Sequence, residues 1–287
     1  MTEDTSARGP GTGASTNGAI FRAEGVVKRF GGIRAVDGAA MQVREGSITA
    51  LIGPNGAGKT TFFNVITGFY RPDGGSATFG GYEVLGQPPY AIARRGMVRT
   101  FQITKALARI TVLDNMMLGA PNQPGERLSN ILLRPGSWRE REEEVHEQAM
   151  ELLDVFNLTR LADEYAGTLS GGQRKLLELA RALMAQPRFL LLDEPMAGIN
   201  PTLGRRLLDH MQRLRSNEGV TFLFIEHDME VVMNHSDRVI VMAEGRVIAD
   251  GEPQEVRQDR AVIDAYLGGS TETNGAGSST DQAPEEA

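Results

Sequence analysis

The stretch that decides the fold is Gly53-Pro54-Asn55-Gly56-Ala57-Gly58-Lys59-Thr60. It fits the pattern G-x-x-x-x-G-K-S/T of a phosphate-binding loop, and it lies between a strand predicted over 47–52 and a helix predicted over 60–67. Glycines let the backbone curl so that successive N–H groups point at phosphates, and the helix N-terminus adds positive potential there. We predict that this loop, together with Thr61, binds a nucleotide. The alternative, a glycine-rich turn that binds nothing, is disfavoured by the length of the match.

Two acidic residues follow another apolar strand, predicted over 189–192. Alone, Asp193 and Glu194 would be the solvated end of a buried strand. In a phosphate loop of this kind Lys59 bridges the β- and γ-phosphates, and the Thr60 hydroxyl ligates Mg²⁺. Two acids beside such a loop therefore have the chemistry of a second element of the nucleotide site. Asp193 is predicted to hold the metal through water, and Glu194 to polarise the attacking water as general base.

A third motif is Thr168-Leu169-Ser170-Gly171-Gly172-Gln173, which precedes a helix predicted over 173–184. Ser170 is a plausible N-cap of this helix. Gly171 and Gly172 would expose backbone N–H groups at the positive end of the helix dipole. On its own the segment is equally well explained as an ordinary capped helix.

The order of predicted elements indicates an α/β fold. Strands that alternate with helices imply a largely parallel sheet covered on both faces. Early strands predicted over 20–30, 39–43 and 76–79 suggest an added antiparallel layer, and a mainly helical stretch at about 105–185 looks inserted into the core. We therefore expect a P-loop NTPase (RecA-like) core with an antiparallel β subdomain and an inserted helical subdomain. The polar ends, 1–18 and 268–287, are predicted to be disordered tails around a folded body at 19–267.

Composition excludes several classes of protein. The 287 residues contain no cysteine, so disulfides, thiolate metal sites and a cysteine nucleophile are ruled out. The net charge of −7, without any block of basic residues, argues against a nucleic-acid partner. The apolar runs have strand length and are too short to span a bilayer, and the N-terminus lacks the apolar region of a signal peptide. A role at a membrane would require docking onto another chain.

Taken together, these motifs resemble the ATP-binding subunit of an ABC transporter over nearly all of 20–267, and 169–173 matches the family's signature motif. The resemblance implies ATP and Mg²⁺ as cofactors and a head-to-tail pair of cassettes, identical or not. In such a pair, Ser170, Gly171 and Gly172 of one cassette touch the γ-phosphate held by the other. It also implies two transmembrane permease subunits, a solute-binding protein as an indirect partner, no nucleic acid, and a place on the cytoplasmic face of the plasma membrane.

The family pattern assigns three further residues. Gln102 corresponds to the Q-loop glutamine, which contacts Mg²⁺ or water and links to the membrane subunit. His227 corresponds to the switch histidine, which hydrogen-bonds the γ-phosphate, and Phe30 to the aromatic residue that stacks on adenine. From the residues alone, a loop amide is the alternative for Gln102, and a residue such as Phe30 is more often a core aromatic than a platform for a base. The D-loop at 197–200 reads Ala-Gly-Ile-Asn, which leaves no carboxylate there.

Several segments narrow the resemblance to the branched-chain amino-acid importers. They are 30–36, 67–70, 98–102, 198–201, 226–229 and Ala265-Tyr266-Leu267-Gly268. Related cassettes serve importers of urea and other small solutes, so these solutes remain alternatives to branched-chain amino acids as the cargo. A non-transport ABC ATPase is the remaining alternative, but chromosome-maintenance types need a long coiled coil and translation-associated types carry two cassettes. The sequence has neither feature.

Overall fold

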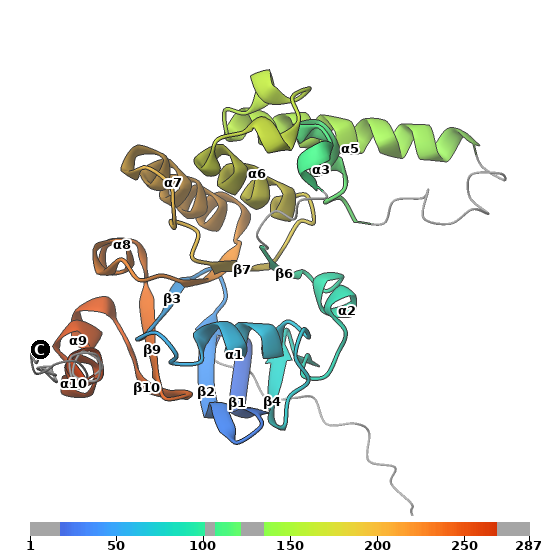
Figure 1. The fold of residues 1–287 in the computed structure, drawn as a ribbon. Helices are drawn as coiled ribbons and strands as arrows, with labels where there is room; N and C mark the ends of the chain where they lie inside the picture. Colours follow the sequence, from blue (N-terminus) through green and yellow to red (C-terminus); the bar gives the residue numbers. More distant parts are fainter. Residues whose placement is uncertain (1–17, 101–106, 122–134, 269–287) are drawn as a thin grey trace, which may run out of the picture.

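The computed structural model describes residues 18–100, 107–121 and 135–268, which form two β-sheets with helices packed around them (Figure 1). Gln102 and nearly all of the two predicted tails lie outside the described residues. The described strands are β1 (Ala19–Phe30), β2 (Ile33–Arg44), β3 (Ile48–Ile52), β4 (Gly74–Phe79), β5 (Tyr82–Glu83), β6 (Met97–Arg99), β7 (Phe189–Asp193), β8 (Thr221–Ile225), β9 (Arg238–Ala243) and β10 (Arg246–Gly251).

The first sheet is antiparallel, with strand order β2-β1-β4-β5. Strand β2 begins at Ile33 rather than at Ala39, because the pairing of Phe30 with Ile33 carries the β1–β2 ladder up to the turn at 31–32. Along β2 the buried residues Ala39, Met41 and Val43 alternate with exposed ones, so one face of this sheet packs inward. The predicted antiparallel layer is therefore present.

The second sheet has the order β10-β9-β3-β8-β7-β6, and all of its strands except the edge strand β10 run parallel. Every residue of β3 and β8 is buried, as expected for central strands covered on both faces. The β9–β10 hairpin turns through Glu244 and Gly245, which have φ of 49° and 78°. Positive φ at both central residues is typical of a tight hairpin turn. The predicted largely parallel sheet is confirmed.

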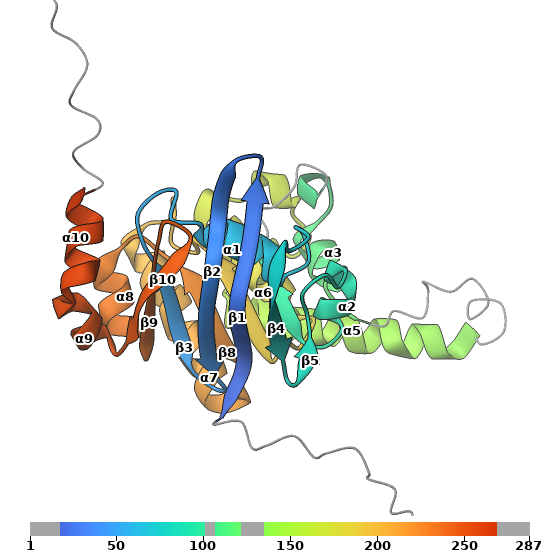
Figure 2. The same cartoon turned by 90° about the horizontal axis from the view of Figure 1, so that it is seen from below.

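Helices cover both faces of the parallel sheet. The described α-helices are α1 (Lys59–Ile66), α2 (Pro89–Ala93), α3 (Val112–Met117), α5 (Pro135–Val155), α6 (Gly171–Leu183), α7 (Pro201–Glu218), α8 (Met229–His235), α9 (Pro253–Gln258) and α10 (Arg260–Gly268). Short 3₁₀ turns lie at Leu107–Arg109, Thr159–Leu161 and Ala166–Thr168. Figure 2 shows α9 and α10 on one side of the molecule and α5 reaching out on the other.

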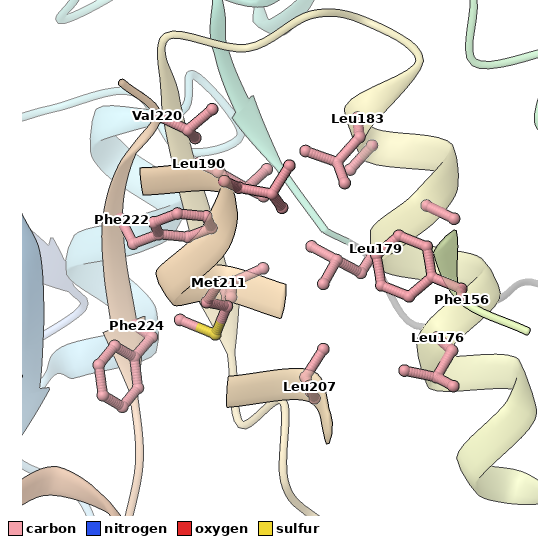
Figure 3. Close-up of a cluster of buried hydrophobic side chains, with 14 of the residues drawn as sticks. Phe156, Leu176, Leu179, Leu183, Leu190, Leu207, Met211, Val220, Phe222 and Phe224 are labelled. Atoms are coloured by element: carbon pink, nitrogen blue, oxygen red, sulfur yellow. The ribbon is translucent and has the colours of Figure 1, made fainter. Parts of the chain in front are cut away.

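Two hydrophobic cores lie on opposite faces of the parallel sheet. One surrounds α1, where Phe62 and Phe63 pack with Phe21 of β1 and Leu223 of β8 between the two sheets. The other lies under α5, α6 and α7; Figure 3 shows side chains from these helices or their ends meeting sheet residues that include Leu190, Phe222 and Phe224. Helix α6 thus has an apolar face fixed against the sheet.

The sequence did not predict α2, β6, α9 or α10. Each of these elements is short, and α2 and α9 start at prolines, so none has a long repeat of apolar residues from which it could be predicted. The chain was expected to close with the β9–β10 hairpin, but α9 and α10 follow it. Helix α9 begins with a capping box formed by Glu252 and Glu255, and α10 packs onto both α9 and β10.

Candidate functional site

The phosphate loop joins β3 to α1 at the carboxyl end of the parallel sheet. Two of its glycines are required by close neighbours: a Cβ on Gly53 would lie 1.9 Å from the carbonyl oxygen of Met242, and one on Gly58 would lie 2.2 Å from that of Ala35. Gly58 is the N-cap of α1, and no side chain caps the helix. The first N–H groups of α1 therefore remain available to an anion.

The β9–β10 turn and the C-terminal helix hold this loop from outside. The Gly245 N–H donates to the Ala57 carbonyl at 3.0 Å, and the Asp37 N–H donates to the Gly245 carbonyl at 2.9 Å. Burial raises the pKa of Tyr266 in α10, and a hydrogen bond with the backbone of Gly53 lowers it in part. Segments from both ends of the chain thus fix the loop's shape.

The Lys59 side chain folds back over the loop. Its Nζ donates to the carbonyl oxygens of Gly53 at 2.7 Å and Pro54 at 3.0 Å, and the residue is 6% exposed. Burial lowers the pKa of Lys59, while the nearby carboxylates of Glu194 and Asp193 raise it. The cation is therefore positioned over the loop, at the point where phosphates would enter.

Asp193 ends β7 and is paired with an arginine. Arg99 Nη2 lies 2.8 Å from Asp193 Oδ2, and Arg99 Nη1 donates to Asn64 Oδ1 of α1 at 2.6 Å. The Arg99 side chain is 9% exposed. One buried guanidinium therefore ties the end of β7 to the helix that follows the phosphate loop.

Glu194 comes directly after Asp193 and has an unusual backbone conformation, with φ of 50°. Its Oε1 lies 2.6 Å from Nε2 of His227, beyond the end of β8. An ionised carboxylate only accepts hydrogen bonds, so the imidazole is the donor in this contact. The predicted base and the predicted switch histidine are brought together, although 33 positions separate them in the chain.

A buried glutamate supports this pair from behind. Glu226 Oε1 accepts the Met196 N–H at 2.8 Å, and Oε2 accepts the His227 N–H at 3.2 Å. Burial raises the pKa of Glu226, and these two backbone hydrogen bonds lower it. The side chain therefore joins the loop after β7 to the loop after β8.

A cavity of about 310 Å³ lies beside these residues; we call it the acidic cavity. It is lined by Thr60, Arg99, Thr100, Lys175, Glu178, Asp193, Glu194 and Ala197. Glu178 of α6 is only 7% exposed. Burial raises its pKa from 4.5 to about 7, Lys175 and Arg181 lower it, and Asp193 raises it further. The cavity thus joins the phosphate loop, the end of β7 and α6.

The start of α6 bears out Ser170 as an N-cap. Ser170 Oγ accepts the Gln173 N–H, and the Gln173 side chain accepts the Ser170 N–H, which makes a capping box. Ser170 and Gly171 are exposed, but Gly172 is buried, and a Cβ there would lie 2.2 Å from Cδ2 of Leu203. Helix packing therefore already accounts for glycine at position 172.

Phe30 lies at the end of β1, and its residue is 45% exposed. Its ring contacts Tyr70 edge to face, with centroids 5.3 Å apart, and the Lys28 ammonium lies 5.3 Å from the ring centroid. An exposed aromatic of this kind is not a core residue. Gln102 lies outside the described residues, so its assignment stays a prediction.

The chain is similar to known proteins along most of its length. A profile described as "ABC transporter" matches residues 36–197, and a second, described as "Branched-chain amino acid ATP-binding cassette transporter", matches residues 246–271. The chain belongs to the ABC transporter family. The predicted family and fold class are confirmed.

Relatives of this cassette align along most of their length. A probable branched-chain amino acid transport ATP-binding protein LivG of Archaeoglobus fulgidus is 43% identical over 87% of this chain and 95% of its own. The high-affinity branched-chain amino acid transport ATP-binding protein BraF of Pseudomonas aeruginosa is 43% identical over 87% of this chain and 98% of its own. A crystal structure of a nucleotide-free ATP-binding cassette from an ABC transporter superposes with a TM-score of 0.76 at 41% identity, covering 86% of this chain and 98% of that one.

Sequence reasoning missed several residues of the cassette's site. Arg99 was noticed only within the segment 98–102, and Tyr266 only as part of the C-terminal motif. Glu226 likewise was noticed only within the segment 226–229, whereas no prediction was made for Lys175 or Glu178. For Glu178 a signal existed, because a carboxylate among the apolar positions of an amphipathic helix departs from the expected pattern.

Proposed function

We propose that the cassette is the ATP-hydrolysing subunit of an importer for branched-chain amino acids. The observation that carries hydrolysis is the 2.6 Å contact between Glu194 and His227, beside a cavity that also receives Thr60 and Asp193. The names of the relatives LivG and BraF, and the profile match at 246–271, support the cargo. Importers of urea or another small solute, and a non-transport ATPase, are the alternatives that the experiments below address.

The chemistry follows from the positions of these side chains. Lys59 and the free N–H groups of α1 neutralise and orient the phosphates. Glu194 accepts a proton from the attacking water while the water oxygen forms a bond to the γ-phosphorus. The bond between the γ-phosphorus and the bridging β-phosphate oxygen breaks, which releases ADP. His227 Nε2 donates to the Glu194 carboxylate in this structure, and by the family pattern its N–H would turn to the γ-phosphate when ATP is bound.

Magnesium fits the donors of this site. The Thr60 hydroxyl and the Asp193 carboxylate both line the acidic cavity, and oxygen donors are those that Mg²⁺ prefers. When bound, the ion neutralises the charge on the phosphates. Gln102 would complete the set by the family pattern.

A second cassette would complete each ATP site. Ser170 and Gly171 are exposed at the N-terminus of α6, where a phosphate held by a partner cassette can be reached. No helix in the described ranges is long and apolar enough to cross a membrane. From its membership of the ABC transporter family, we propose that the cassette pair attaches to two permease subunits at the cytoplasmic face of the plasma membrane, with a solute-binding protein acting on the far side.

The test of hydrolysis is Glu194→Gln, which keeps the side chain's shape and removes its basicity. The full-length variant should bind ATP, accumulate as an ATP-bound dimer in size-exclusion chromatography, and release little phosphate. Glu147→Gln, at an exposed position of α5, is the matched control and should turn over normally. Normal turnover by Glu194→Gln would remove Glu194 as the base.

The cargo is tested in liposomes that contain the cassettes with their co-purified permeases and solute-binding protein. ATP-driven uptake of radiolabelled leucine, isoleucine or valine supports the proposal. Uptake of urea in their place would assign the cassette to the alternative cargo. ATPase activity without uptake of either solute, and without any co-purified permease, would favour the non-transport alternative.

A further inference from the structure

The backbone of the catalytic Glu194 is held at every polar group. Its N–H donates to the Ile225 carbonyl of β8 at 3.0 Å. Its carbonyl oxygen accepts the Ala197 N–H at 3.1 Å and the Lys175 Nζ at 3.2 Å. The Lys175 contact differs from the other two because it comes from α6, the helix that begins with the signature motif. Lys175 therefore reaches from that helix to the catalytic loop.

The hydrogen bond from Lys175 helps to hold Glu194 in its strained backbone conformation. A non-glycine residue in the left-handed region persists only where its surroundings fix it. The φ of 50° sets the direction in which the Glu194 side chain leaves the backbone, and so the place of its carboxylate beside His227. A charged donor on the carbonyl fixes the peptide plane that follows, because a hydrogen bond to an ionised group is stronger than one between neutral groups.

The Lys175 ammonium is suited to this position by its surroundings. It lines the acidic cavity with the side chains of Glu178, Asp193 and Glu194. Glu178 lies one helical turn further along α6, where residues three apart are neighbours. The negative charges of Asp193 and Glu194 attract the Lys175 ammonium to this side of α6, where it reaches the Glu194 carbonyl oxygen.

A second contact joins α6 to the end of the loop after β7 and to the first turn of α7. Gly172 packs against Leu203 and Ile199, close enough that a methyl group would not fit. The two contacts lie about one turn apart on α6, one apolar and one polar. The start of α6 and the segment from Glu194 to Leu203 are therefore connected as one unit.

We propose that Lys175 is a positioning residue for the reaction: it fastens the backbone of Glu194 to the signature helix of the same cassette. The inference rests on the proposed function, in which α6 meets ATP held by the partner cassette. Helix α6 then faces the partner's nucleotide at Ser170 and Gly171 and holds its own cassette's base through Lys175. Engagement of α6 by the partner is in this way transmitted to the place of Glu194.

The test compares three full-length variants at the start of α6. Lys175→Met keeps the length of the side chain and removes the donor, and Lys175→Arg restores a charged donor. Arg174→Met removes a charge from the exposed neighbouring position, which makes it the matched control. For each, kcat and KM for ATP are measured by phosphate release, the dissociation constant with a fluorescent ATP analogue, and the melting temperature without nucleotide.

We expect Lys175→Met to lower kcat by about 10- to 100-fold, the usual effect of a small misplacement of a catalytic group. Its nucleotide affinity should stay within about 2-fold of wild type, because the phosphate loop is untouched. Lys175→Arg should recover most of the rate, and Arg174→Met should behave as wild type. This split between kcat and affinity would not arise from a general loss of structure.

Several results would overturn the inference. They are an unchanged kcat in Lys175→Met, an equal loss of rate in Arg174→Met, or weaker nucleotide binding with normal turnover. If Lys175→Met does not fold, Lys175→Gln takes its place, and normal turnover in that variant overturns the inference equally. Absence of ATP hydrolysis by the wild-type chain is a separate outcome, since it would refute the proposed function itself.

Discussion

The buried carboxyl group of Glu178 gives a pH-dependent stability that a single substitution should remove. In the folded cassette burial raises its pKa from 4.5 to about 7. Between these two values the folded chain holds a proton that the unfolded chain has lost. The stability from this group is therefore complete below the unfolded pKa, and it is lost as the pH rises through the folded pKa.

The size of the effect follows from the same two values. Each pKa unit corresponds to about 1.4 kcal/mol, so the rise of the Glu178 pKa to about 7 is worth at most about 3 kcal/mol above that pH. Relaxation around a charged Glu178 reduces this figure, and we expect about 1–3 kcal/mol. Glu178→Gln has the same shape and does not titrate. It should gain stability relative to wild type by that amount between about pH 5 and about pH 8.

Urea denaturation of the full-length chain, without nucleotide or Mg²⁺, measures this directly. Wild type, Glu178→Gln and the exposed control Glu147→Gln are compared at both pH values. For Glu147→Gln, the difference in unfolding free energy from wild type should be the same at both pH values. A Glu178→Gln difference that is the same at both pH values would show that Glu178 is charged in the folded cassette and refute the reasoning.

Three further predictions concern the phosphate loop and its support. Lys59→Ala should raise the dissociation constant for ATP by about 10-fold or more in isothermal titration, because a charged hydrogen bond is worth about 1.5–3 kcal/mol; unchanged affinity would contradict the site. Gly53→Ala should unfold at lower urea than Gly56→Ala, because only the first meets a backbone carbonyl, at 1.9 Å, while the second finds open space; equal midpoints would contradict the crowding. Arg99→Met should lose about 2–3 kcal/mol of stability because it leaves Asp193 unpaired, and a double-mutant cycle with Asp193→Asn should show coupling between the two positions.

Local patterns made the nucleotide site visible in the sequence. The phosphate loop needs glycines and a lysine at fixed spacing, and Asp193 follows an apolar strand, so both are marked within a few residues. The cap at Ser170 was predictable for the same reason, since its partner Gln173 lies three residues away. These parts of the fold depend on chemistry between near neighbours.

Contacts between distant segments were not predictable. Arg99 and Asp193 are 94 positions apart, and Lys175 lies on a different element from Glu194, so no spacing rule marks either pair. At Gly172 the structure adds a second reason for glycine that the sequence does not reveal. The sequence suggests that this glycine exposes its N–H to phosphate, whereas the fold also needs it for packing against Leu203. Tertiary packing, rather than local preference, decides such positions.

The left-handed backbone of Glu194 bears on how this cassette can change under selection. That conformation costs a non-glycine residue about 1–2 kcal/mol, which glycine would not incur. A library selected for heat resistance alone would therefore favour glycine at this position, and under the proposed function glycine removes the catalytic base. At this position the residue that stabilises the fold differs from the residue that the proposed reaction requires. Directed evolution of the cassette must screen for activity in every round, or its most heat-resistant descendants will be inactive.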